Sequence, residues 1–266
     1  MGIDQTFETI LRLSVFLTAL IAIAVLEAIY PRRVMRIPKV LRWRTNIGIS
    51  VVNQILSRLV IPVSATALAI VCAERGWGLL HQVALPSPFE FAFAIIFLDF
   101  IIYWQHRLYH LIPVLWRFHR MHHADTEFDV TTGIRFHPVS ILLSALIKLG
   151  AVLLLGPSVV SVVIFEILLN ATSLFNHSNL NLPSYVDRIL RRILVTPDMH
   201  RVHHSTLQDE HSHNFGFNFT WWDFLFGSYQ AQPTNGHTDM CIGLSQFRGS
   251  SEIRIRKLLT QPFRNE

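Results

Sequence analysis

The chain has 266 residues, of which 51% are hydrophobic and only 15% are charged, whereas a soluble globular domain carries about 25% charged residues. This composition excludes an ordinary water-soluble domain and predicts that most of the chain lies in lipid. The net charge of +5 is therefore expected to face anionic headgroups of membrane lipids, and no nucleic-acid partner is expected.

Three apolar stretches in the N-terminal part predict membrane spans. Residues 13–30 carry a single charge, Glu27, and a helix of this length is about 27 Å long, close to the ~30 Å hydrocarbon core. The stretch has no small-residue cleavage site at its end, so it is not expected to be a cleaved signal peptide. A second span is predicted at about 47–73, interrupted by Pro62, and a third at about 91–104.

Two shorter apolar runs, residues 139–155 and 158–175, are separated by the turn dipeptide Gly156-Pro157. They predict a helical hairpin, and their length leaves open whether the hairpin crosses the membrane fully or is re-entrant. Lys148 and Glu166 on its two arms are expected to pair. The predicted fold class is all-α, an integral membrane helical bundle of about three spans plus this hairpin, with a His-rich helical cap.

The basic residues predict the orientation in the membrane. Lys and Arg are enriched in cytoplasmic loops. The link after the second span contains only Arg75, whereas the link after the first span contains six basic residues, so the first span is expected to run from outside to inside. Counting the spans forward places both histidine-rich regions on the cytoplasmic face. The six basic residues are Arg32, Arg33, Arg36, Lys39, Arg42 and Arg44.

Ten of the fourteen histidines cluster between positions 106 and 204. One pair has i,i+4 spacing, and two further groups have i,i+3,i+4 spacing. On a helix these offsets place side chains on one face with Cβ atoms about 5–6 Å apart, so that one helix offers two or three imidazoles to a common centre. The ten are His106, His110, His119, His122, His123, His137, His177, His200, His203 and His204.

Such a crowd of imidazoles indicates metal binding. If they protonated independently near a pKa of about 6.5, they would repel one another beside a bilayer, whereas divalent cations make the crowd favourable. Because one site needs three or four ligands, eight or nine histidines indicate two metal ions. Imidazole suits iron, copper, zinc and nickel alike. The two cysteines, Cys72 and Cys241, are isolated in the sequence, which excludes sulfur-ligated metal sites.

The other histidines differ in their expected roles. His177, at the edge of the predicted hairpin, is expected to be a ligand. His137 precedes Pro138 and is either a turn residue or a donor to a ligand. His211 and His213 are expected to make ordinary loop hydrogen bonds, with extra ligands as the alternative. The two remaining isolated histidines, His81 and His237, are expected to be loop or surface residues.

Other polar and aromatic residues beside these histidines also suggest roles. Asp99, Tyr103 and Asp198 are expected to orient imidazole N–H groups; for Asp99 the alternative is packing against Arg58. Seven aromatic residues after position 214 form either a substrate lip or, as we favour, an aromatic belt at the membrane interface. These are Phe215, Phe217, Phe219, Trp221, Trp222, Phe224 and Phe226.

A series of motifs follows in a fixed order and resembles the fatty acid hydroxylase / sterol desaturase superfamily over about residues 91–229. Within that superfamily the pattern is most similar to the short, bacterial-type sterol desaturase branch. The motifs are Asp99-x-x-x-Tyr103-Trp104-x-His106-Arg107-x-x-His110, Trp116-Arg117-x-His119-x-x-His122-His123, His200-x-x-His203-His204, Asn214-Phe215-Gly216 and Trp222-Asp223-x-Leu225-Phe226-Gly227.

The resemblance implies a membrane-embedded non-haem enzyme with two iron ions that uses O₂ to hydroxylate or desaturate a C–H bond of a lipid, be it fatty acyl, sterol or another isoprenoid. The branch covers several substrates, so "sterol" is not carried over to this chain. The sequence has no His-Pro-Gly-Gly segment of a fused cytochrome b5, so electrons are expected from a separate ferredoxin or cytochrome b5-type protein with its reductase. The implied iron ligands are His106, His110, His119, His122, His123, His177, His200, His203 and His204.

The expected organisation is one structural domain with three regions. Residues 1–88 form a transmembrane region with a basic link, residues 89–230 form the catalytic region, and residues 231–266 form a basic tail that lies on anionic headgroups. Two other functions remain open: a membrane metal-binding or metal-transport protein, and a dizinc hydrolase. A transport path would distribute ligands through the spans, whereas eight of the nine flank the spans and only His177 touches a span end, which favours catalysis.

Overall fold

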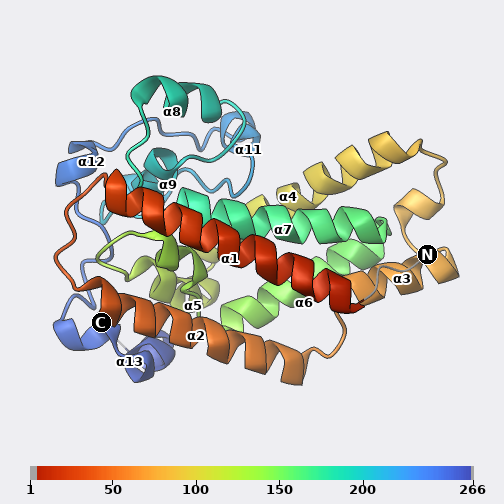
Figure 1. Ribbon diagram of the computed structural model, residues 1–266, viewed down its shortest axis with the longest axis horizontal. Helices are drawn as coiled ribbons and strands as arrows, with labels where there is room; N and C mark the ends of the chain where they lie inside the picture. The colour runs from red at the N-terminus through yellow and green to blue at the C-terminus, as the bar shows by residue number, and fades with distance from the viewer. Residues whose placement is uncertain (1–4, 265–266) are drawn as a thin grey trace.

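The computed structural model describes residues 5–264 and shows a bundle of long helices with a cap of short helices at one end (Figure 1). Within this described range there is no β-strand, only isolated bridges, and the predicted all-α class is confirmed. The five long helices are α1 (Gln5–Ile29), α2 (Lys39–Val60), α4 (Ser87–Leu111), α6 (Pro138–Leu155) and α7 (Val159–Asn176).

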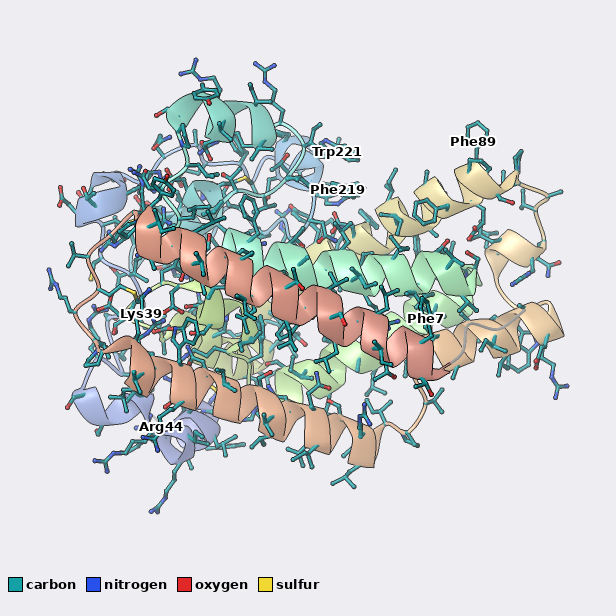
Figure 2. All side chains as sticks on the ribbon, viewed as in Figure 1. Phe7, Lys39, Arg44, Phe89, Phe219 and Trp221 are labelled. Atoms are coloured by element: carbon teal, nitrogen blue, oxygen red, sulfur yellow. The ribbon has the colours of Figure 1, made fainter. Side chains whose placement is uncertain are left out.

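The surface of the bundle is apolar. Each long helix lies in a segment long and apolar enough to cross a membrane, which confirms three spans plus a hairpin. Phe7, Ile21 and Phe89 are each more than half exposed, and a soluble protein rarely exposes apolar surface of this extent. Phe7 and Phe89 lie toward the end opposite the cap, whereas Lys39 and Arg44 lie at the cap end (Figure 2). The chain is a multi-pass membrane protein.

The second predicted span is divided into two helices. α2 ends two residues before Pro62, which has no N–H to continue a helix. Residues 61–64 then lead into α3 (Ala65–Arg75), whose first turn is capped by the Ser64 hydroxyl. α2 also begins at Lys39 rather than at the predicted residue 47, so part of the basic link is helical.

α4 extends beyond the predicted third span and carries two of the clustered histidines. It continues to Leu111, where Pro113 starts a new helix. His106 and His110 therefore lie on its last two turns. The expectation that only His177 touches a span end is wrong, because the helix continues through the polar residues that follow the apolar run.

α6 and α7 form the predicted hairpin, and each is long enough to cross a membrane. Gly156 at the turn has a φ of 65°, and a Cβ there would lie 2.3 Å from the carbonyl oxygen of Trp77, so this close approach requires glycine. Lys148 pairs with Glu166 as predicted, and Glu166 also binds Arg12 of α1 at 2.6 Å. α7 packs mainly against α1, and α6 against α2 and α3.

The cap gathers short segments from several parts of the chain. A separate short turn, η1 (Leu79–His81), precedes α4 at the other end of the bundle. The cap elements are α5 (Pro113–His123), η2 (Val130–Ile134), α8 (Ser184–Leu190), α9 (Pro197–His203), α10 (Gln208–His211), α11 (Trp221–Leu225), α12 (Gly236–Asp239), η3 (Ser250–Ile253), α13 (Ile255–Thr260) and η4 (Gln261–Phe263).

The C-terminal segment is part of this cap rather than a free basic tail. Arg120 of α5 donates to the carbonyls of Gln261 and Arg264, at 2.9 and 2.8 Å, and α13 packs against α2. These contacts tie the segment to the helix that carries three of the clustered histidines. Its exposed side chains, such as Arg254 and Arg256, remain available to lipid headgroups.

Candidate metal centre

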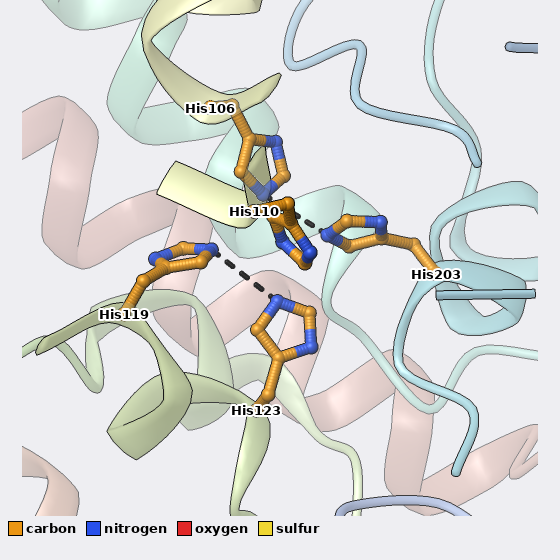
Figure 3. Close-up of side chains that lie close together, drawn as sticks. All are labelled: His106, His110, His119, His123 and His203. Carbon is orange, nitrogen blue, oxygen red and sulfur yellow. Dashed lines mark hydrogen bonds between the residues drawn. The ribbon is translucent and has the colours of Figure 1, made fainter. Parts of the chain in front are cut away.

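The nine histidines predicted as ligands meet in the cap, where α4, α5, α9 and the end of α7 come together. They form two clusters, in each of which the candidate ligand nitrogens all lie within 4.8 Å of one another. The rings of one cluster point toward a common centre (Figure 3). The first cluster consists of His106, His110, His119, His123 and His203, and the second of His122, His177, His200 and His204.

The helix period divides the two i,i+3,i+4 histidine motifs between the clusters, whereas the i,i+4 pair His106 and His110 on α4 lies wholly in the first cluster. On α5, His119 and His123 are four residues apart and share the first cluster, whereas His122 belongs to the second. At α9 the arrangement is reversed: the i,i+4 pair His200 and His204 belongs to the second cluster and the intervening histidine to the first. Consecutive residues on a helix point about 100° apart, so each of these two motifs contributes to both clusters.

Backbone carbonyls orient four of the rings. In each case Nδ1 lies within hydrogen-bond distance of a carbonyl oxygen and must donate, because a carbonyl only accepts. The neutral ring then presents its lone pair on Nε2. The four bonds run from His106 to Phe215 (2.8 Å), from His203 to His213 (2.7 Å), from His122 to Arg135 (3.1 Å) and from His177 to Ser173 (2.8 Å).

These lone pairs face one another within each cluster. The Nε2 atoms of His106 and His203 are 3.0 Å apart, as drawn in Figure 3, and those of His122 and His177 are 3.1 Å apart. Since both rings of each pair donate through Nδ1, neither neutral ring has an N–H to offer its partner. Two lone pairs at this distance repel unless a cation lies beside them.

A proton is poorly suited to be that cation. Burial lowers the pKa of His177 to about 3. Burial, with further lowering from neighbouring imidazoles, also holds the pKa of six other cluster histidines well below the ordinary value. The clusters are therefore neutral at pH 7 and offer lone pairs to a metal. The six are His119, His122, His123, His200, His203 and His204.

The distances between ring nitrogens fit two divalent metal ions. Metal–imidazole bonds of about 2.0–2.1 Å place neighbouring ligand nitrogens about 2.9–3.4 Å apart in tetrahedral or octahedral geometry, and the closest Nε2 pairs lie 3.0–3.3 Å apart. Both ring nitrogens of His110 and of His204 are buried and have no hydrogen-bond partner among residues 5–264. A metal bond would satisfy one nitrogen of each ring, and an all-imidazole donor set is compatible with iron.

Asp99, Tyr103 and Asp198 make no hydrogen bond to a cluster imidazole within residues 5–264, so the prediction that they orient imidazole N–H groups is wrong. Asp99 accepts from the backbone N–H groups of Asn218 and Phe219 and from the Trp222 indole, and it does not pack against Arg58. The Tyr103 hydroxyl binds that of Ser228 at 2.8 Å. Likewise, Asp198 pairs with Arg32 and Arg201. Backbone carbonyls take the orienting role because they lie closer to the rings.

Asp99 and Tyr103 instead support the loop of residues 213–219, which supplies two of those carbonyls. The sequence reasoning missed the central residue of this support, Asp223. Its carboxylate accepts from the N–H groups of Phe215 and Gly216, at 2.9 and 2.8 Å, and from the Ser228 hydroxyl at 2.7 Å. The Trp-Asp-x-Leu-Phe-Gly motif was the available signal. Burial raises the pKa of Asp223 to about 6, and these hydrogen bonds oppose the shift.

The histidines with undecided roles lie outside both clusters. His137 caps α6, since its Nδ1 accepts from the Val139 N–H and its Nε2 donates to the Leu259 carbonyl; it is a turn residue. The ring of His211 stacks on Trp116 near the first cluster. His213 serves through its backbone oxygen, and its own ring donates to the Asp209 carbonyl.

The aromatic residues after position 214 divide between two environments. Phe215 is buried against the rings of His106, His110 and His203, and Phe217 lies beside His106 and His177. Trp221 and Phe224, in contrast, are exposed, and Figure 2 shows Trp221 and Phe219 projecting from the cap flank on the side of the long helices. The exposed residues suit a membrane-interface belt, and the buried ones form an apolar wall at the clusters.

A buried ion-pair network below α5 was also missed by the sequence reasoning. Arg42 of α2 is 1% exposed and binds the carboxylates of Asp125 and Asp129. Although burial raises the pKa of Asp125, the positive charges of Arg42 and Arg135 lower it below its ordinary value. Arg135 is the residue whose carbonyl orients His122. Arg42, one of the six basic residues from which the membrane orientation is predicted, therefore holds the loop after α5 in place.

Comparisons with known proteins agree with this geometry. Three relatives are an ornithine lipid hydroxylase of Rhizobium tropici (30% identical, covering 67% of this chain and 51% of the relative), an alkylglycerol monooxygenase of Homo sapiens (27%, 58% and 33%) and a methylsterol monooxygenase of Arabidopsis thaliana (27%, 58% and 59%). The chain thus spans between a third and three fifths of the length of these relatives. No solved structure matches it.

The family match covers the part of the chain that builds the clusters. Residues 91–228, more than half of the chain, match the family described as fatty acid hydroxylase. This range includes the last turns of α4, all of α5, the end of α7, α9 and the loop of residues 213–219. The chain belongs to the fatty acid hydroxylase family.

Proposed function

We propose that this protein is a membrane-bound di-iron oxygenase that hydroxylates or desaturates a C–H bond of a lipid. The observation that carries the proposal is the pair of neutral histidine clusters, in which Nε2 lone pairs converge at 3.0–3.3 Å. Each cluster provides at least four imidazoles for one iron ion. The nine histidines that hold the two ions are those of the first and second clusters.

The two irons, when bound, supply the electron transfer to O₂ that attack on an unactivated C–H bond requires. The chain contributes ligands, their orientation and exclusion of water. Phe136 stacks on His122 at a ring-centroid distance of 4.4 Å, and Phe128 packs against His177 and His204. Phe136 and Phe128 exclude water from the second cluster, and Phe215 excludes it from the first. Exclusion of water strengthens the electrostatic interactions inside both clusters.

A lipid substrate is supported by the surroundings of the clusters and by the relatives. His106 and His110 lie on the last two turns of a helix long and apolar enough to cross a membrane, so the first cluster adjoins the end of a span. The three relatives are named for an ornithine lipid, an alkylglycerol and a methylsterol. The compounds in these names are all lipids. The named activities, one hydroxylase and two monooxygenases, share the oxidation of a C–H bond.

The electrons come from a separate ferredoxin or cytochrome b5-type protein with its reductase, at the cytoplasmic face. The support is the basic link at the cap end of α1 and α2, which the charge distribution rule places in the cytoplasm. The clusters also gather at one end of the bundle rather than along it. That placement favours an enzyme over a metal-transport path.

Metal analysis combined with isotope labelling tests the proposal. The full chain, purified anaerobically in detergent, is expected to contain about two irons, the number that two mononuclear donor sets would bind. With ¹⁸O₂ and a ferredoxin–reductase system, membrane-lipid extract is expected to yield either ¹⁸O-labelled hydroxylated lipid or newly unsaturated lipid. Zinc in place of iron, with hydrolysis products and no oxidised lipid, would establish a hydrolase instead.

A further inference from the structure

A polar cavity lies on the side of the cap away from the histidine clusters. It has a volume of about 390 Å³ and lies between the segment after α1, α8 and the start of α9, within the roughly 300–1,000 Å³ typical of ligand pockets. Its walls include Arg32, Arg188, Arg191 and Asp187, and Asp198 lies at one side. Asp198 precedes His200 by two residues, about 200° around the helix, so α9 separates the cavity from the second cluster.

The cavity wall contains buried polar atoms that the fold leaves unsatisfied. Arg191 and Asp187 are each 8% exposed and pair with one another. The Nε of Arg191 and the Oδ1 of Asp187 nevertheless have no hydrogen-bond partner in the described part of the chain. Both atoms are covered in the structure, so a ligand in the cavity reaches them only when the side chains of this pair shift. A buried polar atom without a partner is unfavourable, which favours such a shift.

The three arginines differ in how fully the protein occupies them. Arg32 binds Asp198 at 3.0 Å and the Asn181 side chain at 3.2 Å. Arg191 also donates to the Ala231 carbonyl at 2.9 Å. The exposed side chain of Arg188 forms no hydrogen bond or ion pair with any residue between 5 and 264. The cavity therefore offers the free guanidinium of Arg188 to an anion, and a shift of the Arg191–Asp187 pair adds a second guanidinium and a carboxylate oxygen.

The position along the chain sets the depth of the cavity in the membrane. Arg32 follows the last residue of α1 by three positions, and Asn181 follows the last residue of α7 by five. Three residues extend at most about 11 Å, and the headgroup layer of each leaflet is roughly 5–8 Å thick. The cavity therefore lies beside the headgroups of the leaflet nearest the cap. On α8, Tyr185 and Ile189 expose apolar surface next to it.

We propose that this cavity binds the anionic headgroup of a membrane lipid, with the phosphate on Arg188 and, after a shift of its side chain, on Arg191, and a neighbouring hydroxyl or ammonium group on Asp187. Guanidinium groups match phosphate geometry, and Tyr185 and Ile189 contact the glycerol and upper acyl region. An acidic partner protein suits the site less well, because the unsatisfied atoms lie inside a concave wall rather than on a flat surface. The site does not depend on the iron centre.

Native mass spectrometry of the full chain in neutral detergent tests this site. Phosphatidylglycerol is titrated against phosphatidylcholine, with and without inorganic phosphate and glycerol 3-phosphate as competitors. Arg188→Gln is expected to weaken phosphatidylglycerol binding at least ~10-fold, the lower end for the loss of one hydrogen bond to a charged group. Ser184→Trp, which fills the cavity from an exposed position and keeps every charge, is expected to weaken it similarly.

The matched control is Arg192→Gln, because Arg192 is exposed on the same segment and does not line the cavity. It is expected to leave binding unchanged. Equal losses in both arginine variants would show diffuse attraction and overturn the proposal. Arg188-dependent binding of inorganic phosphate or glycerol 3-phosphate, without binding of the lipid, would assign the cavity to a soluble anion. Weaker ferredoxin binding by Arg188→Gln, with lipid binding intact, would overturn it in favour of a protein-docking surface.

Discussion

At the scale of single residues, hydrogen bonds to the backbone determine how four of the nine imidazoles present their lone pairs. His106 and His203 both donate through Nδ1 to carbonyls of one loop, so both present Nε2 lone pairs to the first cluster. His122 and His177 do the same in the second cluster through the Arg135 and Ser173 carbonyls. The tautomer follows from the acceptor at Nδ1 and not from the histidine motif itself.

His122→Ala and His203→Ala each remove one donor from a different cluster. Each variant is expected to lose activity and to retain about one of two irons, because the other cluster keeps its ligands. Membrane insertion is expected to persist, since no span is altered. Iron content by elemental analysis and a membrane-flotation assay measure these outcomes.

His213→Ala is the control for these variants, because His213 serves the first cluster through its backbone oxygen, which the substitution keeps. Iron content and activity are expected to stay near those of the unmodified chain. Full activity in either ligand variant, or iron loss in His213→Ala equal to theirs, would contradict the assigned roles.

Asp223→Asn tests the support of the loop of residues 213–219. The amide keeps the shape of the carboxylate but offers one acceptor oxygen in place of two, and Phe215 and Gly216 donate to different oxygens. We expect iron affinity or activity to fall about 10–100-fold, as for other groups that orient metal ligands. The measurement is iron retention under a graded chelator, which reports on the metal site independently of turnover. Retention equal to that of the unmodified chain would show that the loop holds its position without Asp223.

At the scale of elements, the cap is attached to the bundle by polar contacts as well as apolar packing. α2 carries Arg42 beneath α5, where its guanidinium binds Asp125 and Asp129. Trp43, the next residue, donates to Asp129 at 3.3 Å. The loop between α5 and α6 is thereby fixed to a membrane helix, and with it the carbonyl of Arg135 that orients His122.

Arg42→Met is expected to destabilise the protein by about 3–5 kcal/mol, because it leaves buried carboxylates without their counter-charge. Arg44→Met is the matched control, since Arg44 is exposed two residues further along the same helix, about 200° around it from Arg42. Thermal unfolding in detergent, followed by Trp fluorescence, measures both. Equal midpoints for the two variants would show that the buried pair contributes no more than a surface arginine.

At the scale of the whole molecule, the cap with the candidate metal-ligating histidines lies at one end of the bundle, and the exposed apolar side chains of Phe7 and Phe89 lie toward the other (Figures 1 and 2). Cys241 is exposed in the cap, and Cys72 is buried within the bundle. Of the two native cysteines, only Cys241 is therefore accessible to a labelling reagent, and its labelling reports the side of the membrane on which the cap lies. This makes the proposed cytoplasmic orientation accessible to labelling.

A membrane-impermeant maleimide is expected to label Cys241 in inverted vesicles and not in intact cells. Ala84→Cys in a Cys241→Ser background is expected to show the opposite pattern, because Ala84 is exposed beside η1 at the far end of the bundle. Mass spectrometry of the labelled chain reads out both. The reverse pattern would place the histidine clusters outside and overturn the predicted orientation.

Hydropathy and spacing determined the all-α class, three spans, the apolar hairpin and the positions of the clustered histidines, because helix period and burial in lipid act over a few neighbouring residues. The same local signals misplaced the end of α4 and assigned Asp99 to imidazole orientation. Asp99 binds residues 119 to 123 positions away, and Arg42 binds residues 83 and 87 positions away. Contacts at such separations depend on how the helices pack. Only the tertiary structure could therefore divide the histidines into two clusters and fix the direction of each lone pair.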